Sequence, residues 1–192
     1  MVPKFTLPLF PISAHILPGG KMSLKIFEPR YIRMVKEACA ADKGFGICML
    51  NSQGDKQLNQ HICSIGTHVK VVDFEVLAGG LLGITIEADK CFRISDIETE
   101  SDELRVGSCE WLPAWIFEGE IADIKPLDDR LKEVFDQYPN LESLYERPLF
   151  TDPIWVVYRW LELLPVNIEE KQHFLKQNNY VKALEFLTHF IK

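Results

Sequence analysis

The segment Gly19-Gly20-Lys21 is the closest match in this chain to a phosphate-binding loop. Such a loop needs the pattern GxxxxGK followed by Ser or Thr, because backbone amides and the lysine together surround the phosphates. Here Met22 follows the lysine, and the upstream glycine is missing. The segment is therefore interpreted as a turn between two strands, and no nucleotide cofactor is predicted.

Two further arrangements of reactive side chains have simple structural explanations. His61, Cys63 and His68 could begin a metal site, but metal sites need three or four ligands at recurring spacings, and alternating side chains of a strand explain this set as well. No GxSxG nucleophile motif is present, and Cys39 and Cys63 are interpreted as inert thiols. The sequence therefore predicts no catalytic residue, no metal and no cofactor, and hence a protein that is not an enzyme.

Four tryptophans, Trp111, Trp115, Trp155 and Trp160, allow two interpretations. They could line an apolar binding groove, or they could fill the core, which is the commoner place for such side chains. The core interpretation is favoured for each of them.

Composition restricts the class of partner. The 192 residues carry a formal net charge of −7, which argues against sequence-independent nucleic-acid binding but still allows a local basic patch. No apolar run is long enough to span a membrane, and the prolines near the amino terminus do not fit a signal peptide. Five cysteines without a CxxC pair then indicate reduced thiols in a cytoplasmic protein.

The amino-terminal part has the two-residue period of strands, interrupted by one helix. Alternating apolar residues predict strands in the first 26 residues, and Glu28-Pro29 ends the second strand and starts a helix that extends to Cys39 or Ala40. A buried strand follows at 45–50, and four more are expected between 64 and 113, two of them at 81–89 and 91–97. Gly66 and Gly83 are predicted to mark bulges. Six or seven short strands suggest a closed or nearly closed β-barrel.

After Trp115 the apolar period changes from 2 to 3.6. Helices are expected at about 127–138, 153–164, 167–178 and 180–191, with Asn167 as an amino-terminal cap and Glu170 in capping-box position. The second of them is apolar on nearly all sides, so it should form the centre of a helical bundle. These patterns predict two subdomains, residues 1–117 and 118–192.

The segment LPLFP, followed by a Pro-Gly loop and then IFEPRY leading into a helix, resembles the amino-terminal domain of Lon ATP-dependent proteases. Cys91 stands where that family has an arginine before the phenylalanine. The resemblance continues through most of the chain, at Phe45-Gly46, Ile65-Gly66-Thr67, Phe92-Arg93-Ile94, Leu163-Leu164-Pro165 and Glu169-Glu170-Lys171-Gln172.

The resemblance implies an α+β fold in which a PUA-like β pseudobarrel with one inserted helix precedes an α-helical bundle. In the full-length proteases this domain precedes an AAA+ ATPase and a Ser-Lys peptidase, and neither is expected here. The resemblance thus implies a stand-alone, non-enzymatic module that either binds unfolded or damaged polypeptide or acts as an adaptor for a protease. No membrane association is expected, and the sequence predicts no particular oligomeric state.

The binding surface is expected in a groove between the barrel and the helices, lined by apolar residues that stay uncovered. Leu17, Pro18, Tyr31 and Trp155 are the predicted polypeptide-binding residues.

The motif Glu28, Pro29, Arg30 and Tyr31 is interpreted as structural, through a cap and an ion pair joining barrel to helix. A place in a ligand groove is its alternative role.

Two other functions stay open. PUA-like barrels also occur in RNA-modifying proteins, so an RNA-binding module is the first alternative, and it would need a basic face with aromatic residues. A small-molecule-binding protein or hydrolase is the second, and it would need a deep polar cavity with clustered titratable groups.

Overall fold

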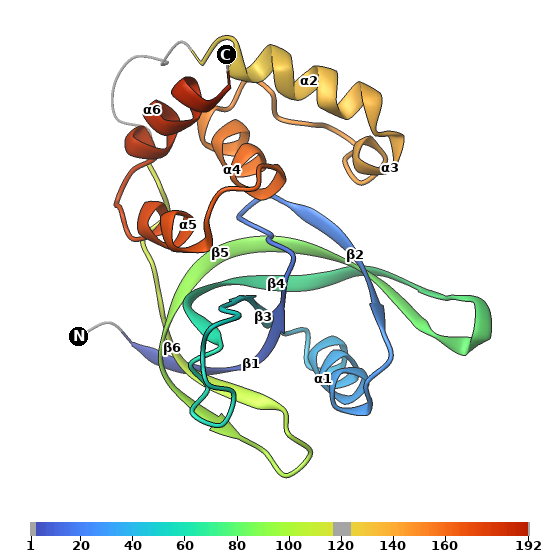
Figure 1. Cartoon of the computed structure of the whole chain (residues 1–192). Coiled ribbons are helices and arrows are strands. Elements are labelled where there is room, and N and C mark those ends of the chain that lie inside the picture. The colour runs from blue at the N-terminus through green and yellow to red at the C-terminus, as the bar shows by residue number, and fades with distance from the viewer. Residues whose placement is uncertain (1–2, 117–123, 192) are drawn as a thin grey trace. The chain divides into compact units, whose positions relative to one another are not determined.

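The computed structural model describes residues 3–116 and 124–191 (Figure 1). The chain divides into two compact units, the first ending at Leu112 and the second beginning at Pro113. The boundary predicted at residues 117 and 118 lies outside the described residues. Each unit is described separately below.

The first unit is built on a six-stranded sheet in the order β2-β5-β4-β3-β1-β6. β6 also pairs with β5, so the pairing returns on itself and the sheet curls into a pseudobarrel, as predicted. Its strands are β1 (Lys4–Ile12), β2 (Lys21–Ile26), β3 (Phe45–Leu50), β4 (Ile62–Val76), β5 (Leu82–Thr99) and β6 (Arg105–Trp111), with helix α1 (Pro29–Ala40) inserted between β2 and β3 and a 3-10 turn, η1 (Ala78–Gly80), between β4 and β5.

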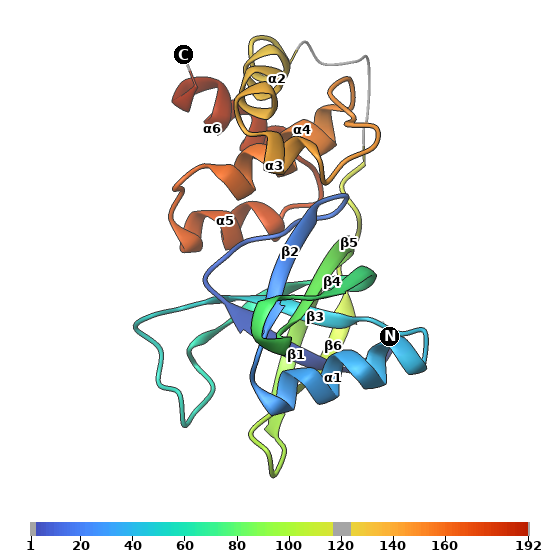
Figure 2. The same cartoon turned by 90° about the vertical axis from the view of Figure 1, so that its right-hand side faces the viewer.

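Two apolar clusters fill this unit. Leu7 and Leu9 of β1 point inward, as their alternation predicts, and they pack with Phe92 of β5 and Cys109 of β6. The second cluster lies under α1, which runs along one side of the sheet (Figure 2). The helix contributes the apolar stripe expected from its 3.6-residue period, namely Tyr31, Met34, Val35 and Ala38.

The prediction of two separate strands at 81–89 and 91–97 is wrong, because both belong to β5. The register of β4 against β5 shifts between Thr67 and Val69, which pair with Cys91 and Ala88 respectively. Asp89 and Lys90 therefore stand opposite the single residue His68. This bulge changes the phase of the alternation, so one long strand has the sequence pattern of two.

Gly66 and Gly83 do not mark the bulges, because both keep regular pairing partners on the neighbouring strands. Gly66 instead makes room for an aromatic ring. A Cβ there would lie 2.6 Å from Cζ of Phe92, far closer than van der Waals contact.

The motif at the start of α1 connects the helix to the turn between β5 and β6. Pro29 occupies the first helical turn, but the Glu28 side chain makes no cap, so that part of the prediction is wrong. The predicted ion pair is present, with Arg30 Nη2 2.5 Å from Glu28 Oε2 and Arg30 Nη1 3.1 Å from Glu103 Oε2. Tyr31 stacks on Phe10 of β1, with ring centroids 4.1 Å apart.

The second unit is helical, as predicted. Asp152 caps α4 by accepting hydrogen bonds from the amides of Ile154 and Trp155, and Asn167 caps α5 by accepting one from Glu169 N. Its helices are α2 (Leu127–Gln137), the short α3 (Pro139–Glu142), α4 (Pro153–Leu163), α5 (Ile168–Leu175) and α6 (Val181–Phe190).

α4 is buried on nearly all sides, which confirms the prediction from its composition. Its Trp155 lies in a group of aromatic rings with Phe135, Tyr145 and Phe150, at centroid distances of 5.6 to 5.9 Å. The same helix buries the guanidinium of Arg159, whose charge is met by Glu162 one turn later.

Candidate functional site

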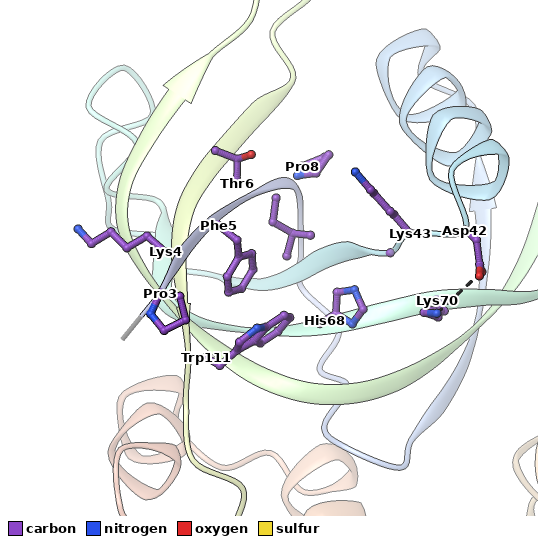
Figure 3. Close-up of a pocket in the computed structure, with 12 residues that line it drawn as sticks. Pro3, Lys4, Phe5, Thr6, Pro8, Asp42, Lys43, His68, Lys70 and Trp111 are labelled. Carbon is purple, nitrogen blue, oxygen red and sulfur yellow. Dashed lines mark ion pairs between the residues drawn. The ribbon is translucent and has the colours of Figure 1, made fainter. Parts of the chain in front are cut away.

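A pocket of about 500 Å³ opens in the first unit beside the first half of β1 (Figure 3). A continuous run of the chain, Pro3 to Pro8, forms one wall. Residues 42–44, which lead from α1 into β3, and part of β4 form the others. The remaining lining residues are Asp42, Lys43, Gly44, His68, Lys70 and Trp111.

Aromatic rings form the apolar part of the pocket. Phe5 stacks on Trp111, with centroids 4.1 Å apart, and the His68 ring meets Trp111 edge-on at 5.5 Å. Phe5 and Trp111 are half-buried, and both pack against the inner cluster that contains Phe92. A ligand side chain entering here would meet a rigid apolar surface.

Lysines surround these rings. Lys4, Lys43 and Lys70 line the pocket with exposed side chains, whereas Asp42 is the one acidic lining residue, and its carboxylate lies 3.8 Å from Lys70 Nζ. The β5 bulge adds Lys90, whose ammonium lies 4.5 Å from the centroid of the Trp111 ring. The same bulge places Asp89 3.9 Å from Lys90, so it adds no net charge. The pocket is locally basic, in a chain of net charge −7, through its three lining lysines.

His68 is held neutral inside this basic site. Burial lowers the pKa of its imidazole, and Lys70 and Lys90 act in the same direction. Asp89, 3.5 Å from His68 Nδ1, opposes them but does not outweigh the burial. At neutral pH the ring is then an aromatic wall of the pocket rather than a further cation.

We expect the first unit to lose stability as the pH falls below about 6.5, because the unfolded chain then protonates His68 while the folded chain resists it. His61 shares this direction, since burial also lowers its pKa. The variant His68→Gln should therefore reduce the difference in unfolding free energy between pH 7 and pH 5, measured by urea denaturation. His61→Gln should reduce this pH-dependent difference in unfolding free energy further. A full pH dependence in His68→Gln would contradict this assignment.

The family of the chain follows from comparison with known proteins. The model of the substrate-binding domain of the ATP-dependent protease La (LON) matches residues 6–192. The chain belongs to the LON substrate-binding domain family. This confirms the resemblance seen in the opening motifs.

Two solved structures share the fold. A Lon N-terminal domain protein from Xanthomonas campestris is 24% identical, with a TM-score of 0.70 over 98% of this chain and 99% of that one. The N-terminal domain of a Mycobacterium avium complex Lon protease is 15% identical, with a TM-score of 0.61 over 95% of this chain and 96% of that one. No curated protein matches the chain.

The residues predicted to bind polypeptide do not form an exposed surface in this LON substrate-binding domain. Leu17, Tyr31 and Trp155 are 0%, 8% and 5% exposed, so the expectation that they stay uncovered is wrong, and only Pro18 is half-exposed. Tyr31 and Trp155 each serve the core of their own unit through ring contacts. A direct part in binding stays a prediction.

The pocket residues were not predicted as a group. Trp111 was weighed as either groove or core, and it belongs to both, since it is half-buried and lines the pocket. Phe5 and Lys70 gave no signal, because each is an ordinary strand residue until the pairing is known. The basic patch that the net charge still allowed is present at this site.

The buried thiols of the first unit have raised pKa values. Burial raises the pKa of the Cys91 and Cys109 thiols to about 12, so these sulfurs stay protonated and unreactive. Residues 3–116 and 124–191 contain no group of three or more His, Cys, Asp or Glu placed to hold a metal ion. Within the same ranges, no helix has the length and apolar character needed to cross a bilayer.

Proposed function

We propose that this LON substrate-binding domain binds unfolded or damaged polypeptide and presents it to a protease, without catalysing a reaction itself. The observation that carries the proposal is the family match over residues 6–192, since the family is that of the substrate-binding part of an ATP-dependent protease. The presentation step and the protease partner extend the proposal beyond the family match.

The pocket supports binding that tolerates many sequences. Apolar burial against Phe5 and Trp111 is non-directional. In addition, β1 pairs with β3 only from Leu9 onward, so within the described residues the outer edge of Lys4–Pro8 can bond to backbone groups that every polypeptide carries. Native proteins keep such backbone groups and apolar side chains inside, so the site would favour unfolded chains. The proposal includes a cytoplasmic location, with which the five free cysteines agree.

The test compares one client in two states. Reduced and carboxymethylated α-lactalbumin should bind, and the native, disulfide-intact form should not, as followed by isothermal titration calorimetry. Binding of the unfolded client should show a negative heat-capacity change, because apolar surface is buried. Equal binding of both forms, or of neither, would remove the proposal.

The protease partner needs a separate experiment. The tagged chain should co-purify with a protease from cell extract, identified by mass spectrometry, and an added unfolded client should increase its recovery. Recovery of clients without any protease would leave polypeptide binding in place and remove the presentation step.

RNA binding is a second candidate, favoured by one observation. Lys4, Lys43 and Lys70 stand around the stacked rings of Phe5 and Trp111, and lysines beside aromatic rings are the usual means of holding single strands. Single-stranded RNA should then bind with an affinity that falls steeply between 50 and about 200 mM salt. Weak binding at low salt would reject this candidate.

A further inference from the structure

The first half of β1 is a strand edge that no other strand uses. Its residues Lys4 to Leu9 pair with β6 on one side. On the other side, pairing with β3 starts only at Leu9, which stands opposite Gly46. Among the described residues, Lys4–Pro8 have no second neighbouring strand.

The missing neighbour would be an upstream extension of β3. Instead the chain before Phe45 turns away toward α1, with Asp42 in the left-handed region at φ 48°. The pairing of β3 with β4 also begins only at Phe45, which stands opposite Val69, so β3 has no residues before Phe45 on that side either. The pocket lies beside the edge that an extended β3 would cover, since Lys4 to Pro8 all line it (Figure 3).

Such an edge is a template for an added strand. Alternate residues of a strand direct their backbone N–H and C=O groups to opposite sides, so one set along Lys4–Pro8 faces away from β6. An extended peptide can pair with these groups while its alternate side chains enter neighbouring pockets. Pro8 has no N–H, which limits the donors at that end. Five residues of strand give a pairing length of about 16 Å.

The side chains around the edge specify which peptide fits. Side chains on one face of an added strand would meet the rings of Phe5 and Trp111, which favours apolar or aromatic residues. Three lysines, Lys4, Lys43 and Lys70, line the pocket against one lining acid, Asp42, and the neighbouring Lys90 and Asp89 add one charge of each sign. Acidic residues beside the apolar ones would complement this charge.

Resting on the proposed function, we propose that the free edge of β1 at Lys4–Pro8 binds an acidic, apolar-bearing segment of an unfolded polypeptide as an added β-strand. The bound segment replaces the β3 extension that the fold lacks. Its apolar side chains enter the pocket at Phe5 and Trp111, and its carboxylates meet Lys4, Lys43 and Lys70.

The experiment uses the full chain and three kinds of seven-residue peptide with capped ends. The first alternates glutamate with phenylalanine and valine. The second has the same side chains but N-methylated amides at alternate positions. It is made in two versions, one methylated along each edge, so that one version loses the donors that face β1 while the other keeps them. The third replaces every glutamate with lysine. Affinity is measured by calorimetry, and hydrogen exchange follows the amides of residues 4–7.

We expect the first peptide to bind and to slow exchange of those amides among residues 4–7 that face away from β6. One N-methylated version should bind at least about tenfold more weakly, because it loses backbone hydrogen bonds, and the lysine peptide should not compete. The variant Lys70→Glu should weaken binding about fivefold or more, whereas Lys25→Glu, the same charge change on an exposed residue of β2 outside the pocket, should leave it unchanged.

Other outcomes overturn the inference in separable ways. If both N-methylated versions bind as well as the first peptide, the pocket is a side-chain groove and no strand is added. If unfolded α-lactalbumin binds but Lys70→Glu has no effect, the site lies elsewhere, while the proposed function stands. Loss of binding only in Phe74→Ser, on the exposed end of β4, would place the site there. Displacement of the peptide by single-stranded RNA with a steep salt dependence would assign the pocket to nucleic acid.

Discussion

The variant Glu162→Gln should lose about 3–5 kcal/mol of unfolding free energy from the helical unit, because it removes the carboxylate that pairs with a buried guanidinium. The Arg159 side chain is 1% exposed, and it donates from Nε to Glu162 Oε2 at 2.6 Å and from Nη2 to Oε1 at 2.7 Å. Glutamine keeps the shape but brings an amide N–H₂ toward those donors. Urea unfolding followed by tryptophan fluorescence measures the loss, in a Trp111→Phe background so that the signal comes from the helical unit.

An exposed pair of the same spacing provides the matched control. Arg130 and Glu133 in α2 are also three residues apart, at 3.0 Å, but both side chains are more than half exposed. Glu133→Gln should therefore cost no more than about 1 kcal/mol. Replacing both buried partners, in Arg159→Met with Glu162→Leu, should recover much of the lost stability. A cost for Glu162→Gln as small as that for Glu133→Gln would show that burial does not set the value of this pair.

Elements with a strong apolar period could be predicted from the sequence. The sequence predicts a helix from about Pro29 to Cys39 or Ala40, and α1 spans Pro29–Ala40. Its apolar stripe, its initial proline and the polar residues after it all favour the same helix. α4 was identified by its unusual composition. β5 could not be predicted as one strand, because the bulge at Asp89 and Lys90 depends on pairing with β4, a strand distant in sequence.

The candidate site was harder to predict, because residue type does not give exposure. Tyr31 and Trp155 have side chains that often bind ligands, yet each is buried by rings from other parts of its unit. The apolar stripe of α1 already placed Tyr31 on the inner face of the helix, so its burial could have been expected. No such local pattern marks Phe5 or Lys70, which come together only through the pairing of β1, β3, β4 and β6.

The bulge in β5 places two charged side chains beside the pocket. It is the reason that Asp89 comes within 3.5 Å of the His68 imidazole and Lys90 lies over Trp111. Bulges frequently redirect side chains next to functional sites. The bulge that makes β5 look like two strands in the sequence therefore also places Asp89 and Lys90 beside the pocket.

The ring of Phe92 and the absent side chain of Gly46 should depend on each other for stability. Phe92 is fully buried, and a Cβ at residue 46 would lie 2.5 Å from its Cζ and 3.1 Å from Cδ2 of Leu7, both side-chain atoms. Gly46→Ala alone should cost about 1–3 kcal/mol through overpacking, and Phe92→Ala alone about 3–5 kcal/mol through the cavity it leaves. The double variant should cost less than the sum, because the new methyl group enters the space that the ring vacates. Urea unfolding of the four proteins gives the coupling energy.

Gly66 provides the control for this double-mutant cycle, because its close neighbours include a backbone atom as well as the Phe92 ring. A Cβ at residue 66 would also approach the Phe92 ring, at 2.6 Å, but it would lie 2.8 Å from the carbonyl oxygen of Ile47, which is backbone. Removing the ring cannot relieve that second contact. Gly66→Ala should therefore stay destabilising in the Phe92→Ala background, where Gly46→Ala becomes tolerated. If the losses of unfolding free energy for Gly46→Ala and Phe92→Ala simply add, the strands must shift to accept the methyl group. The Phe92 ring would then not be the reason that position 46 needs a glycine.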